Sequence, residues 1–256
     1  METILKVEKL CKDSILHEIS FEMAQGEMVA VMGPSGSGKS TLLYNVSGMD
    51  QPSSGRVWLK DTEVTELTED EKAWLRLHRM GFVFQQMNMM ANLNILDNIL
   101  LPAVQANRNP IRQILTAKNK GSRRELTEAA RRLMQKLSIS GLEERRITQV
   151  SGGQLQRACI CRSMMNSPEI LFADEPTGAL DKSSADEVMA ELVKLNREGT
   201  AILIVTHDSR IASRCNRILY LLDGRMCGEL SLGALTAGTE KRREERTSRW
   251  LMEMGR

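Results

Sequence analysis

The spacing of hydrophobic residues predicts a chain that alternates between strands and helices. Three β-type runs, LKVEKL, ILHEISFEM and EMVAVMG, lie within residues 5–33, and the last run ends in a glycine-rich stretch. Residues 39–46 then read as a helix, and Thr68 with Glu71 forms a capping box for a second helix. Residues 82–85 predict a short buried strand. The first third of the chain therefore predicts β structure followed by strands and helices in turn.

The middle of the chain is mainly helical in its pattern. Residues 94–104 predict a helix with Pro102 near its end, and residues 105–121 read as a polar connection or a frayed helix. Apolar positions within residues 126–137 then recur at i, i+3, i+4, i+7, i+8 and i+11, which is the pattern of an amphipathic helix. These segments predict a helical insertion at about residues 87–165.

In the last third of the chain the alternation returns. ILFAD at residues 170–174 and AILIVT at residues 201–206 predict buried strands on either side of a helix at residues 183–197. A hairpin is predicted across Asp223-Gly224, and the tail at residues 237–256 is charged with a few apolar positions. The sequence therefore predicts one more strand–helix–strand unit and a closing hairpin.

Together these elements predict an α/β fold. A length of 256 residues fits one domain with an inserted subdomain. We expect a mostly parallel core sheet, an antiparallel β flank near the N-terminus and an inserted α-helical subdomain. Residues 1–236 are assigned to this domain and residues 237–256 to a charged C-terminal tail.

Composition excludes several classes of protein. The chain has 35 Lys and Arg against 33 Asp and Glu, so a nucleic-acid binder driven by bulk positive charge is not expected. Aromatic residues make up only 4% of the chain, which disfavours stacking platforms for single strands. The longest apolar runs are far shorter than the roughly 20 residues that a membrane helix needs. The N-terminus lacks the apolar core of a signal peptide.

Cysteine usage indicates a reducing compartment. The five cysteines form an odd set without the spacing of a disulfide framework. Cys159 and Cys161 form C-x-C, but only three histidines are available to complete a metal site. We interpret the pair as two small buried residues on a helix.

The strongest motif is a glycine-rich phosphate loop. Gly33-Pro34-Ser35-Gly36-Ser37-Gly38-Lys39-Ser40 matches G-x-x-x-x-G-K-S, follows a predicted strand and opens a predicted helix. Its glycines let backbone N–H groups surround a phosphate at the positive end of the helix. Lys39 can reach the β and γ phosphates, and the Ser40 hydroxyl can bind Mg²⁺.

Two acidic residues follow the strand ILFAD. Asp174 ends that strand, at the edge where open α/β sheets bind their ligands, and is a candidate to hold Mg²⁺ through water. Glu175 is a candidate general base for an attacking water. A pair of acids that caps the next helix is the alternative interpretation.

A second helix start contains small residues that can meet an anion. VSGGQ begins a helix that continues as LQRACICR, and Ser151, Gly152, Gly153 and Gln154 occupy its first positions. By itself this segment also fits an ordinary helix start after a flexible loop.

In their order and their sequences, these motifs resemble those of the ATP-binding subunits of ABC transporters, and the resemblance covers about residues 3–232. The remaining family motifs are Gln85 in FVFQQ, the D-loop Gly178-Ala179-Leu180-Asp181 and His207 in VTHD, and Thr41 follows the phosphate loop as usual. VSGGQ stands in place of the commoner LSGGQ. Taken alone, Gln85 would be a loop amide and His207 a strand-end cap, and only the ordered set favours functional roles.

The resemblance implies a P-loop NTPase that hydrolyses ATP with Mg²⁺. It implies a head-to-tail homodimer, with two ATP molecules between the phosphate loop of one subunit and the signature segment, Ser151 to Gln154, of the other. Gln85 then completes the Mg²⁺ shell with Ser40 and Asp174, and His207 contacts the γ-phosphate. A membrane permease is implied as partner, at the cytoplasmic face of a bacterial membrane, and nucleic acid is not.

The chain departs from the family where adenine is bound. The family usually places an aromatic residue after the first strand, but this chain offers Cys11, Lys12, Asp13 and Ser14. We therefore predict weaker discrimination of ATP over GTP than is usual.

The exact sequences of the motifs favour one branch of the family. GPSGSGKSTLL, GFVFQQMNMM, NILLP and FADEPTGALD resemble lipoprotein-release, macrolide-type and peptide-antibiotic-resistance systems. The C-terminal segments LLDG and REERTSRWLMEMG look most like the bacitracin- and lantibiotic-type resistance group. That likeness implies antimicrobial-peptide resistance or export and a permease with about ten membrane-spanning helices and a large extracellular domain. A sensor histidine kinase is a further candidate partner, and lipoprotein release and cell division remain the alternatives.

Two surface features have both a functional and a structural interpretation. Met87, Met89 and Met90 suit a groove for the permease's coupling helix as well as ordinary core packing. The basic residues of the helical insertion suit anionic lipid headgroups, although a solvated helix face is favoured. They are Arg108, Arg112, Lys118, Lys120, Arg123, Arg124, Arg131, Arg132 and Lys136, against Glu125 and Glu128.

Three rival classes fit the sequence less well. Ribosome-acting ABC factors carry two such domains, whereas this chain has one phosphate loop and one signature. DNA-repair and chromosome-structuring ATPases need a long coiled coil, and no sustained heptads separate Lys39 from Asp174. A pseudo-enzyme that only senses nucleotide is disfavoured because Lys39, Asp174, Glu175 and His207 are intact.

Overall fold

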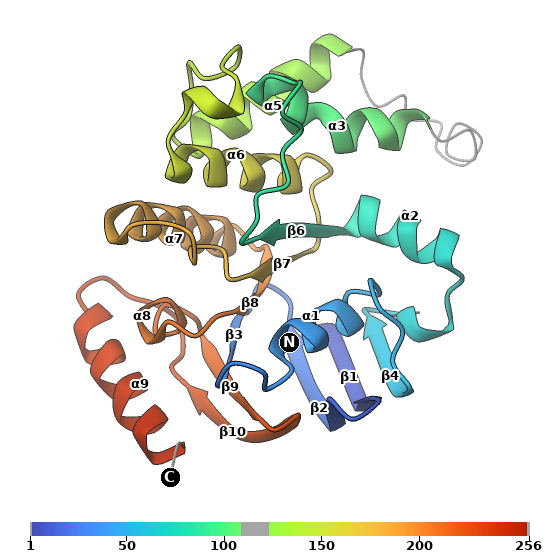
Figure 1. The fold of residues 1–256 in the computed structure, drawn as a ribbon, viewed down its shortest axis with the longest axis vertical. Helices are drawn as coiled ribbons and strands as arrows, with labels where there is room; N and C mark the ends of the chain where they lie inside the picture. Colours follow the sequence, from blue (N-terminus) through green and yellow to red (C-terminus); the bar gives the residue numbers. More distant parts are fainter. Residues whose placement is uncertain (1, 109–122, 255–256) are drawn as a thin grey trace.

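The computed structural model describes residues 2–108 and 123–254, which form two sheets and the helices around them (Figure 1). The larger sheet has six strands in the order β10-β9-β3-β8-β7-β6. All neighbouring pairs are parallel except the β9–β10 hairpin, so the predicted α/β architecture with a mostly parallel core sheet is confirmed. The strands are β3 (Met28–Met32), β6 (Met80–Phe84), β7 (Ile170–Asp174), β8 (Ala201–Val205), β9 (Arg217–Leu222) and β10 (Arg225–Ser231).

The smaller sheet is the predicted antiparallel flank. Its order is β2-β1-β4-β5, and every pair in it is antiparallel. Register shifts occur in β1 and its partners near Lys9, where Lys9 and, on the facing strand, Glu18 have positive φ angles. The strands are β1 (Thr3–Lys12), β2 (Leu16–Ala24), β4 (Ser54–Leu59) and β5 (Thr62–Glu63).

The core sheet separates two hydrophobic clusters. In β3, β7 and β8 every residue is buried, because helices or the second sheet cover both faces. Alternate residues point to opposite clusters: Ala30 packs on the side of the α7 helix, whereas Val31 packs on the side of α1 and the antiparallel sheet. These helices are α1 (Lys39–Val46), α2 (Glu69–Arg79), α7 (Lys182–Arg197) and α8 (Ser209–Ala212), with short 3₁₀ turns at Val64–Glu66 and Ile147–Gln149.

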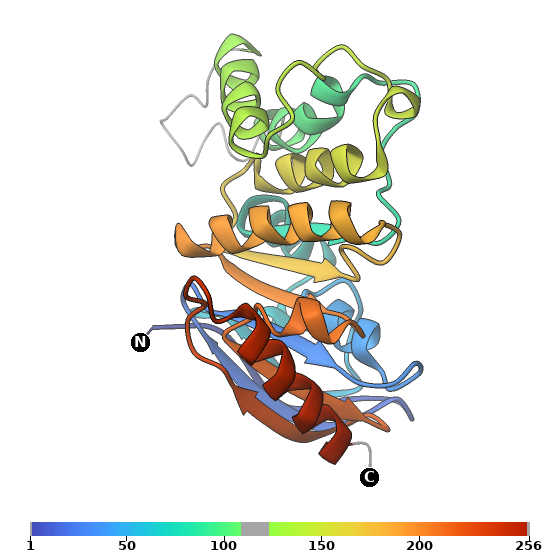
Figure 2. The same ribbon diagram turned by 90° about the vertical axis from the view of Figure 1, so that its left-hand side faces the viewer.

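Three helices form a layer at one end of the molecule: α3 (Ile95–Arg108), α5 (Arg123–Lys136) and α6 (Gly152–Met164) (Figure 2). The predicted helix at residues 94–104 is thus too short. The α3 helix continues past Pro102 because Ala103 and Ala106 are still buried, at 4% and 1% exposure, and burial offsets the lost backbone hydrogen bond. Cys159 and Cys161 are buried on α6, as predicted, and burial raises the pKa of Cys159 to about 11.

A further helix, α9 (Glu240–Met254), lies against α8 and β10 at the other end of the molecule (Figure 1). Its Arg243 is buried and donates to the carbonyl oxygens of Ser213 at 2.7 Å and Cys215 at 2.5 Å. The ring of Trp250 packs edge-on against Tyr220, with centroids 6.0 Å apart. The sequence predicted only a charged tail here, and the structure adds a packed helix.

Smaller differences concern element ends. The β6 strand begins two residues before the predicted start at Phe82, and α8 ends at Ala212 rather than at Cys215. Across residues 2–108 and 123–254, none of the helices combines the length and apolar character needed to cross a bilayer.

Candidate functional site

The phosphate loop lies between β3 and α1, at the carboxyl edge of the core sheet. Gly38 caps the helix with a φ of 96°, and the N–H groups of the first turn have no acceptor within the helix. The Lys39 ammonium donates to the loop's own carbonyl oxygens, Gly33 at 3.0 Å and Pro34 at 2.8 Å. Burial lowers the pKa of Lys39, and the nearby charges of Glu175 and Asp174 oppose that shift. The loop therefore presents a cation and oriented N–H groups to the same space.

Asp174 is fixed by two hydroxyl groups from one face of α1. Ser40 Oγ donates to Asp174 Oδ1 at 3.0 Å, and Tyr44 OH donates to Asp174 Oδ2 at 3.0 Å. Asp174 is only 9% exposed, so these bonds satisfy a nearly buried carboxylate. Burial raises the pKa of Tyr44, and the adjacent Asp174 raises it further. The sequence predicted Ser40 and Asp174, but not Tyr44.

Glu175 is held by the end of β8. Glu175 Oε1 accepts from His207 N at 3.1 Å and lies 2.7 Å from His207 Nδ1, while Thr206 Oγ1 donates to Oε2 at 3.2 Å. The Glu175 side chain is 17% exposed and that of His207 72% exposed. Glu175 also has a φ of 46°, a backbone conformation that costs a non-glycine residue energy and often occurs at functional sites. The two predicted residues are therefore in direct contact.

A cavity of about 570 Å³ extends beside Asp174 and Tyr44 and is also lined by Gln85. The Gln85 amide lies close to the D-loop, because a Cβ placed on Gly178 would be 2.9 Å from Gln85 Nε2. Gln85 thus lines the same cavity as Asp174, and its amide lies next to a segment far along the chain.

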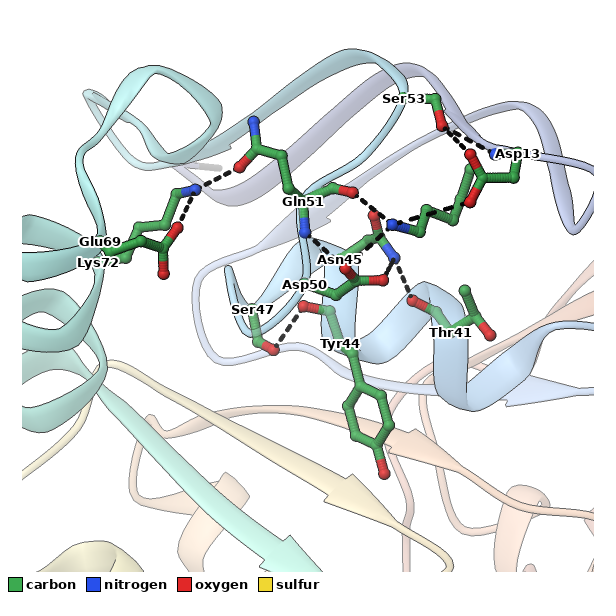
Figure 3. Close-up of polar contacts among 11 residues, drawn as sticks. Asp13, Thr41, Tyr44, Asn45, Ser47, Asp50, Gln51, Ser53, Glu69 and Lys72 are labelled. Atoms are coloured by element: carbon green, nitrogen blue, oxygen red, sulfur yellow. Dashed lines mark hydrogen bonds and ion pairs between the residues drawn. The ribbon is translucent and has the colours of Figure 1, made fainter.

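The loop that follows α1 is tied to its surroundings by a polar network (Figure 3). Lys12 donates to Asp50 Oδ1 at 3.0 Å, and Asn45 Nδ2 donates to Asp50 Oδ2 at 3.3 Å. The buried Lys72 of α2 binds Gln51 and, at 3.0 Å, Glu69. These contacts fix the end of α1 to β1 on one side and to α2 on the other.

The signature segment begins α6 and lies in a different layer from the phosphate loop. Ser151 Oγ accepts from Gln154 N at 3.2 Å, and Gln154 Oε1 accepts from Ser151 N at 2.9 Å, which makes a complete capping box. Ser151 and Gly152 are exposed, whereas Gly153 packs against Ser184 at the start of α7. Asp181 caps α7 by accepting from Ser184 N at 3.0 Å. In both views α7 lies between α6 and the layer that holds α1 (Figures 1 and 2).

The turn between β1 and β2 lies beside the phosphate loop. A Cβ on Gly38 would be 3.3 Å from Ile15 Cγ2, and Ile15 is 42% exposed. Gly224, in the β9–β10 turn, has a φ of 70°, and a Cβ there would be 2.0 Å from Ile15 O. The residues predicted for this region were Cys11 to Ser14, whereas the structure places the exposed Ile15 and the buried Leu16 beside the loop.

A family model described as ABC transporter matches residues 16–178, which is more than half of the chain. The chain belongs to the ABC transporter family. It is 41% identical over 216 residues to the macrolide export ATP-binding/permease protein MacB of Sodalis glossinidius, covering 84% of this chain but only 31% of that protein. The fold is that of a P-loop NTPase, as predicted.

Solved ABC cassettes have the same fold along nearly the whole chain. The cassette MJ0796, described as a dimeric post-hydrolysis state bound to ADP and Pi, superimposes with a TM-score of 0.79 and 33% identity, covering 90% of this chain and all of that one. CbiO1 of Clostridium perfringens, described as part of the ABC transporter complex CbiONQ, gives a TM-score of 0.80 and 27% identity, covering 99% of this chain and all of that one. As an ABC cassette, the chain is an ATPase that uses ATP and Mg²⁺.

The residues around Asp174 fit a magnesium ion. The hydroxyl of Ser40, the carboxylate of Asp174 and the amide of Gln85 are oxygen donors, which Mg²⁺ prefers, and all three lie at or beside one cavity. Mg²⁺ bound there would neutralise charge on the phosphates.

The two surface features are resolved in part. Met90 is 49% exposed, while Met89 packs against the core. Of the described basic residues, Arg123, Arg124 and Lys136 pair with Asp97, Glu128 and Glu198, which agrees with a solvated helix face. Arg112, Lys118 and Lys120 lie outside the described residues, as does the side chain of Arg108.

Proposed function

We propose that this chain is the ATP-hydrolysing subunit of a membrane ABC transporter and works by ATP-driven dimerisation. The observation that carries the proposal is the division of the site. The phosphate loop, Asp174, Glu175 and His207 meet at one edge of the core sheet, while the exposed start of α6 at Ser151 lies in another layer. A second copy in head-to-tail orientation would bring its signature segment to the nucleotide.

In this proposal the phosphate loop holds ATP. The backbone N–H groups from Gly33 to Thr41, except at Pro34, which has none, surround the phosphates, and Lys39 exchanges its loop carbonyl partners for phosphate oxygens. That exchange is favourable because the ammonium is partly desolvated in both states and gains an anionic partner. Ser40, Asp174 and Gln85 hold Mg²⁺. The partner copy contributes Ser151 to Gln154, where the N–H groups of Gly152 and Gly153 at the helix start are not used in the capping box between Ser151 and Gln154.

Glu175 is the proposed general base. Its two oxygens are held by Thr206 and His207, so the carboxylate has a fixed direction and stays an acceptor for a water proton. His207 is exposed and contacts Glu175 at 2.7 Å, which allows its ring to reach the γ-phosphate while holding the base. Asp181 of the D-loop caps α7 beside the signature helix and so links the two halves of the paired site.

A groove of about 330 Å³ supports a permease partner. It lies between α2, β6, α3 and α6, and its apolar lining includes Met49, Leu77, Phe82, Phe84 and Pro102. Two other exposed apolar side chains are Trp74 on α2 and Met90 between β6 and α3, the elements that border the groove. We propose that a helix of the permease lies in this groove and keeps the chain at the cytoplasmic face of a bacterial membrane.

The cargo we propose is an antimicrobial peptide, handled for resistance or export. The likeness to MacB supports the export branch, while the chain spans only 31% of the length of that protein. The wording of the C-terminal segments favours the peptide-resistance group, with its large extracellular permease domain and, as a further candidate, a sensor histidine kinase. Lipoprotein release and cell division are the alternative roles.

The central experiment measures dimerisation. Glu175→Gln should form dimers with ATP and Mg²⁺, seen by sedimentation velocity, and stay monomeric with ADP. A variant that remains monomeric with saturating ATP and Mg²⁺, alone and beside the permease, contradicts the proposal.

Permease docking is tested by cross-linking. In a chain with Cys11 and Cys227 changed to serine, Met90→Cys should cross-link to a cysteine placed in a cytoplasmic loop of the permease encoded beside this chain. Met252→Cys is the matched control, because Met252 is 71% exposed but lies on α9. Equal cross-linking from both positions, or none from Met90→Cys in an active complex, contradicts docking in the groove.

A further inference from the structure

Tyr44 makes a contact that has no role in the ATP binding and hydrolysis proposed for the other site residues. Its hydroxyl donates to Asp174 Oδ2 at 3.0 Å, while Ser40 donates to Oδ1 at the same distance. Residues four apart lie on one face of a helix, so α1 presents both donors together. The carboxylate that ends β7 is thus bound on both oxygens by a single helix.

The direction of the Tyr44 ring is set by how α1 ends. The Tyr44 carbonyl oxygen accepts from Met49 N at 2.9 Å, from Asp50 N at 3.1 Å and from Ser47 Oγ at 3.2 Å. The network of Lys12, Asn45 and Asp50 holds the following loop, and the ring points away from that network (Figure 3). These hydrogen bonds therefore fix the backbone at Tyr44 and direct its hydroxyl toward Asp174.

The two hydroxyls have different chemical possibilities at this place. The Ser40 hydroxyl can donate to Asp174 and still offer a lone pair to a cation. The Tyr44 hydroxyl is a phenolic O–H that donates to Asp174 Oδ2 at 3.0 Å. It therefore acts as a donor that holds the second oxygen of Asp174 and prevents the carboxylate from turning.

We propose that Tyr44 is a positioning residue for the magnesium site: by fixing Asp174, it sets the direction in which Ser40 offers its lone pair. This inference rests on the proposed placement of Mg²⁺ at Ser40 and Asp174. Loss of the hydroxyl leaves Oδ2 of a nearly buried carboxylate without this donor, so the carboxylate can turn and shift the Ser40 hydroxyl away from the direction that suits the cation. Contacts of the phosphate loop with the nucleotide are unaffected.

The test compares nucleotide binding with and without the metal. ADP affinity is measured by calorimetry for the natural chain, Tyr44→Phe and Tyr220→Phe, each in excess Mg²⁺ and in EDTA. Tyr220→Phe is the matched control, since it removes the hydroxyl of the chain's other tyrosine, which packs on Trp250. We expect Tyr44→Phe to lose about tenfold of the strengthening that Mg²⁺ gives, as supporting groups around metal ligands typically do.

The expected result in EDTA is equal affinity for all three proteins. If Tyr44→Phe weakens ADP binding equally in EDTA and in Mg²⁺, Tyr44 only supports packing and the inference fails. If Mg²⁺ strengthens binding equally in Tyr44→Phe and the natural chain, it also fails. If Mg²⁺ has no effect on the natural chain, the proposed metal site itself is wrong, and both proposals fall.

A kinetic measurement separates positioning from general damage. In ATPase assays with increasing Mg²⁺, Tyr44→Phe should need about tenfold more Mg²⁺ for half-maximal rate and should approach the natural kcat at saturation. A lower kcat with an unchanged Mg²⁺ requirement contradicts the positioning role.

Discussion

Two helix starts in the described part of the chain contain glycine, the phosphate loop at α1 and the signature segment at α6, and they are built in opposite ways. Around the phosphate loop the chain closes on itself: a Cβ on Gly33 would lie 2.0 Å from Leu221 O, and one on Gly38 would lie 2.9 Å from Leu16. At the signature, the Ser151 side chain is used in a capping box with Gln154, and Ser151 stays exposed. The phosphate loop is thus enclosed by contacts within the chain, whereas the signature segment is left exposed, as the proposed dimer requires.

The largest effect is expected at the completed half. Glu175→Gln should lower ATPase turnover by about 100- to 10,000-fold, because the amide cannot accept the proton of water. ATP binding, measured by calorimetry, should be retained. Glu245→Gln, an exposed change on α9, serves as control. Near-normal turnover in Glu175→Gln would remove the assignment of the base.

Removal of the phosphate-loop cation should be the next largest change. Lys39→Ala is expected to weaken nucleotide binding by about 10- to 100-fold, since it deletes a charge-assisted bond to phosphate worth about 1.5–3 kcal/mol. Fluorescent-nucleotide titration gives the affinity, and Lys241→Ala on α9 is the control. Unchanged affinity would mean that the loop binds phosphate through its backbone alone.

The signature should behave differently from the phosphate loop. Ser151→Ala is expected to lower ATPase turnover by about tenfold through one lost hydrogen bond, while ADP binding to the monomer stays the same. It also removes a helix cap worth about 1 kcal/mol, so Thr68→Ala is the matched control. Thr68 caps α2 with the same type of capping box.

The comparison breaks down if Thr68→Ala loses as much ATPase activity as Ser151→Ala, because loss of a cap would then explain both. It also breaks down if Ser151→Ala weakens ADP binding to the monomer. If both variants melt at a lower temperature but only Ser151→Ala loses turnover, Ser151 has a role in ATP hydrolysis beyond capping α6.

The smallest effect concerns the nucleobase. An aromatic platform contributes about 1–3 kcal/mol by stacking, and here the exposed side chain beside the loop is the aliphatic Ile15. ATP and GTP should therefore compete for the site with affinities within about tenfold. A competition assay that shows a strong preference for ATP would contradict this prediction.

The sequence predicted the parts of the site that depend on local chemistry. Lys39 and Ser40 follow a strand and open a helix, and Asp174 ends a buried strand, so their positions at the sheet edge were predictable from local pattern alone. The contact between Glu175 and His207 was not, because it depends on the pairing of β7 with β8. Hydrophobic pattern predicts that two strands are buried, but not which strands are neighbours.

Other contacts were missed for related reasons. The spacing of Ser40 and Tyr44 indicates that they share one helix face. A tyrosine at such a position is normally interpreted as a packing residue, so the sequence does not predict that its hydroxyl donates to Asp174. The α9 helix was missed because its few apolar residues lie among many charges, and its main anchor, Arg243, is a residue that normally stays in water. Side-chain hydrogen bonds to distant backbone leave no periodic signal.

The buried guanidinium of Arg243 limits where this protein can be truncated or fused to another domain. Besides Ser213 and Cys215, it binds the carbonyl oxygens of Leu232 at 3.0 Å and Gly233 at 3.2 Å, and so ties the end of α8 to the chain leaving β10. The α8 helix begins at Ser209, two residues after His207. A truncation after residue 236, where the family motifs are already complete, would strip these carbonyls of their donor and loosen the peptide that carries the histidine, so a fusion partner belongs after α9.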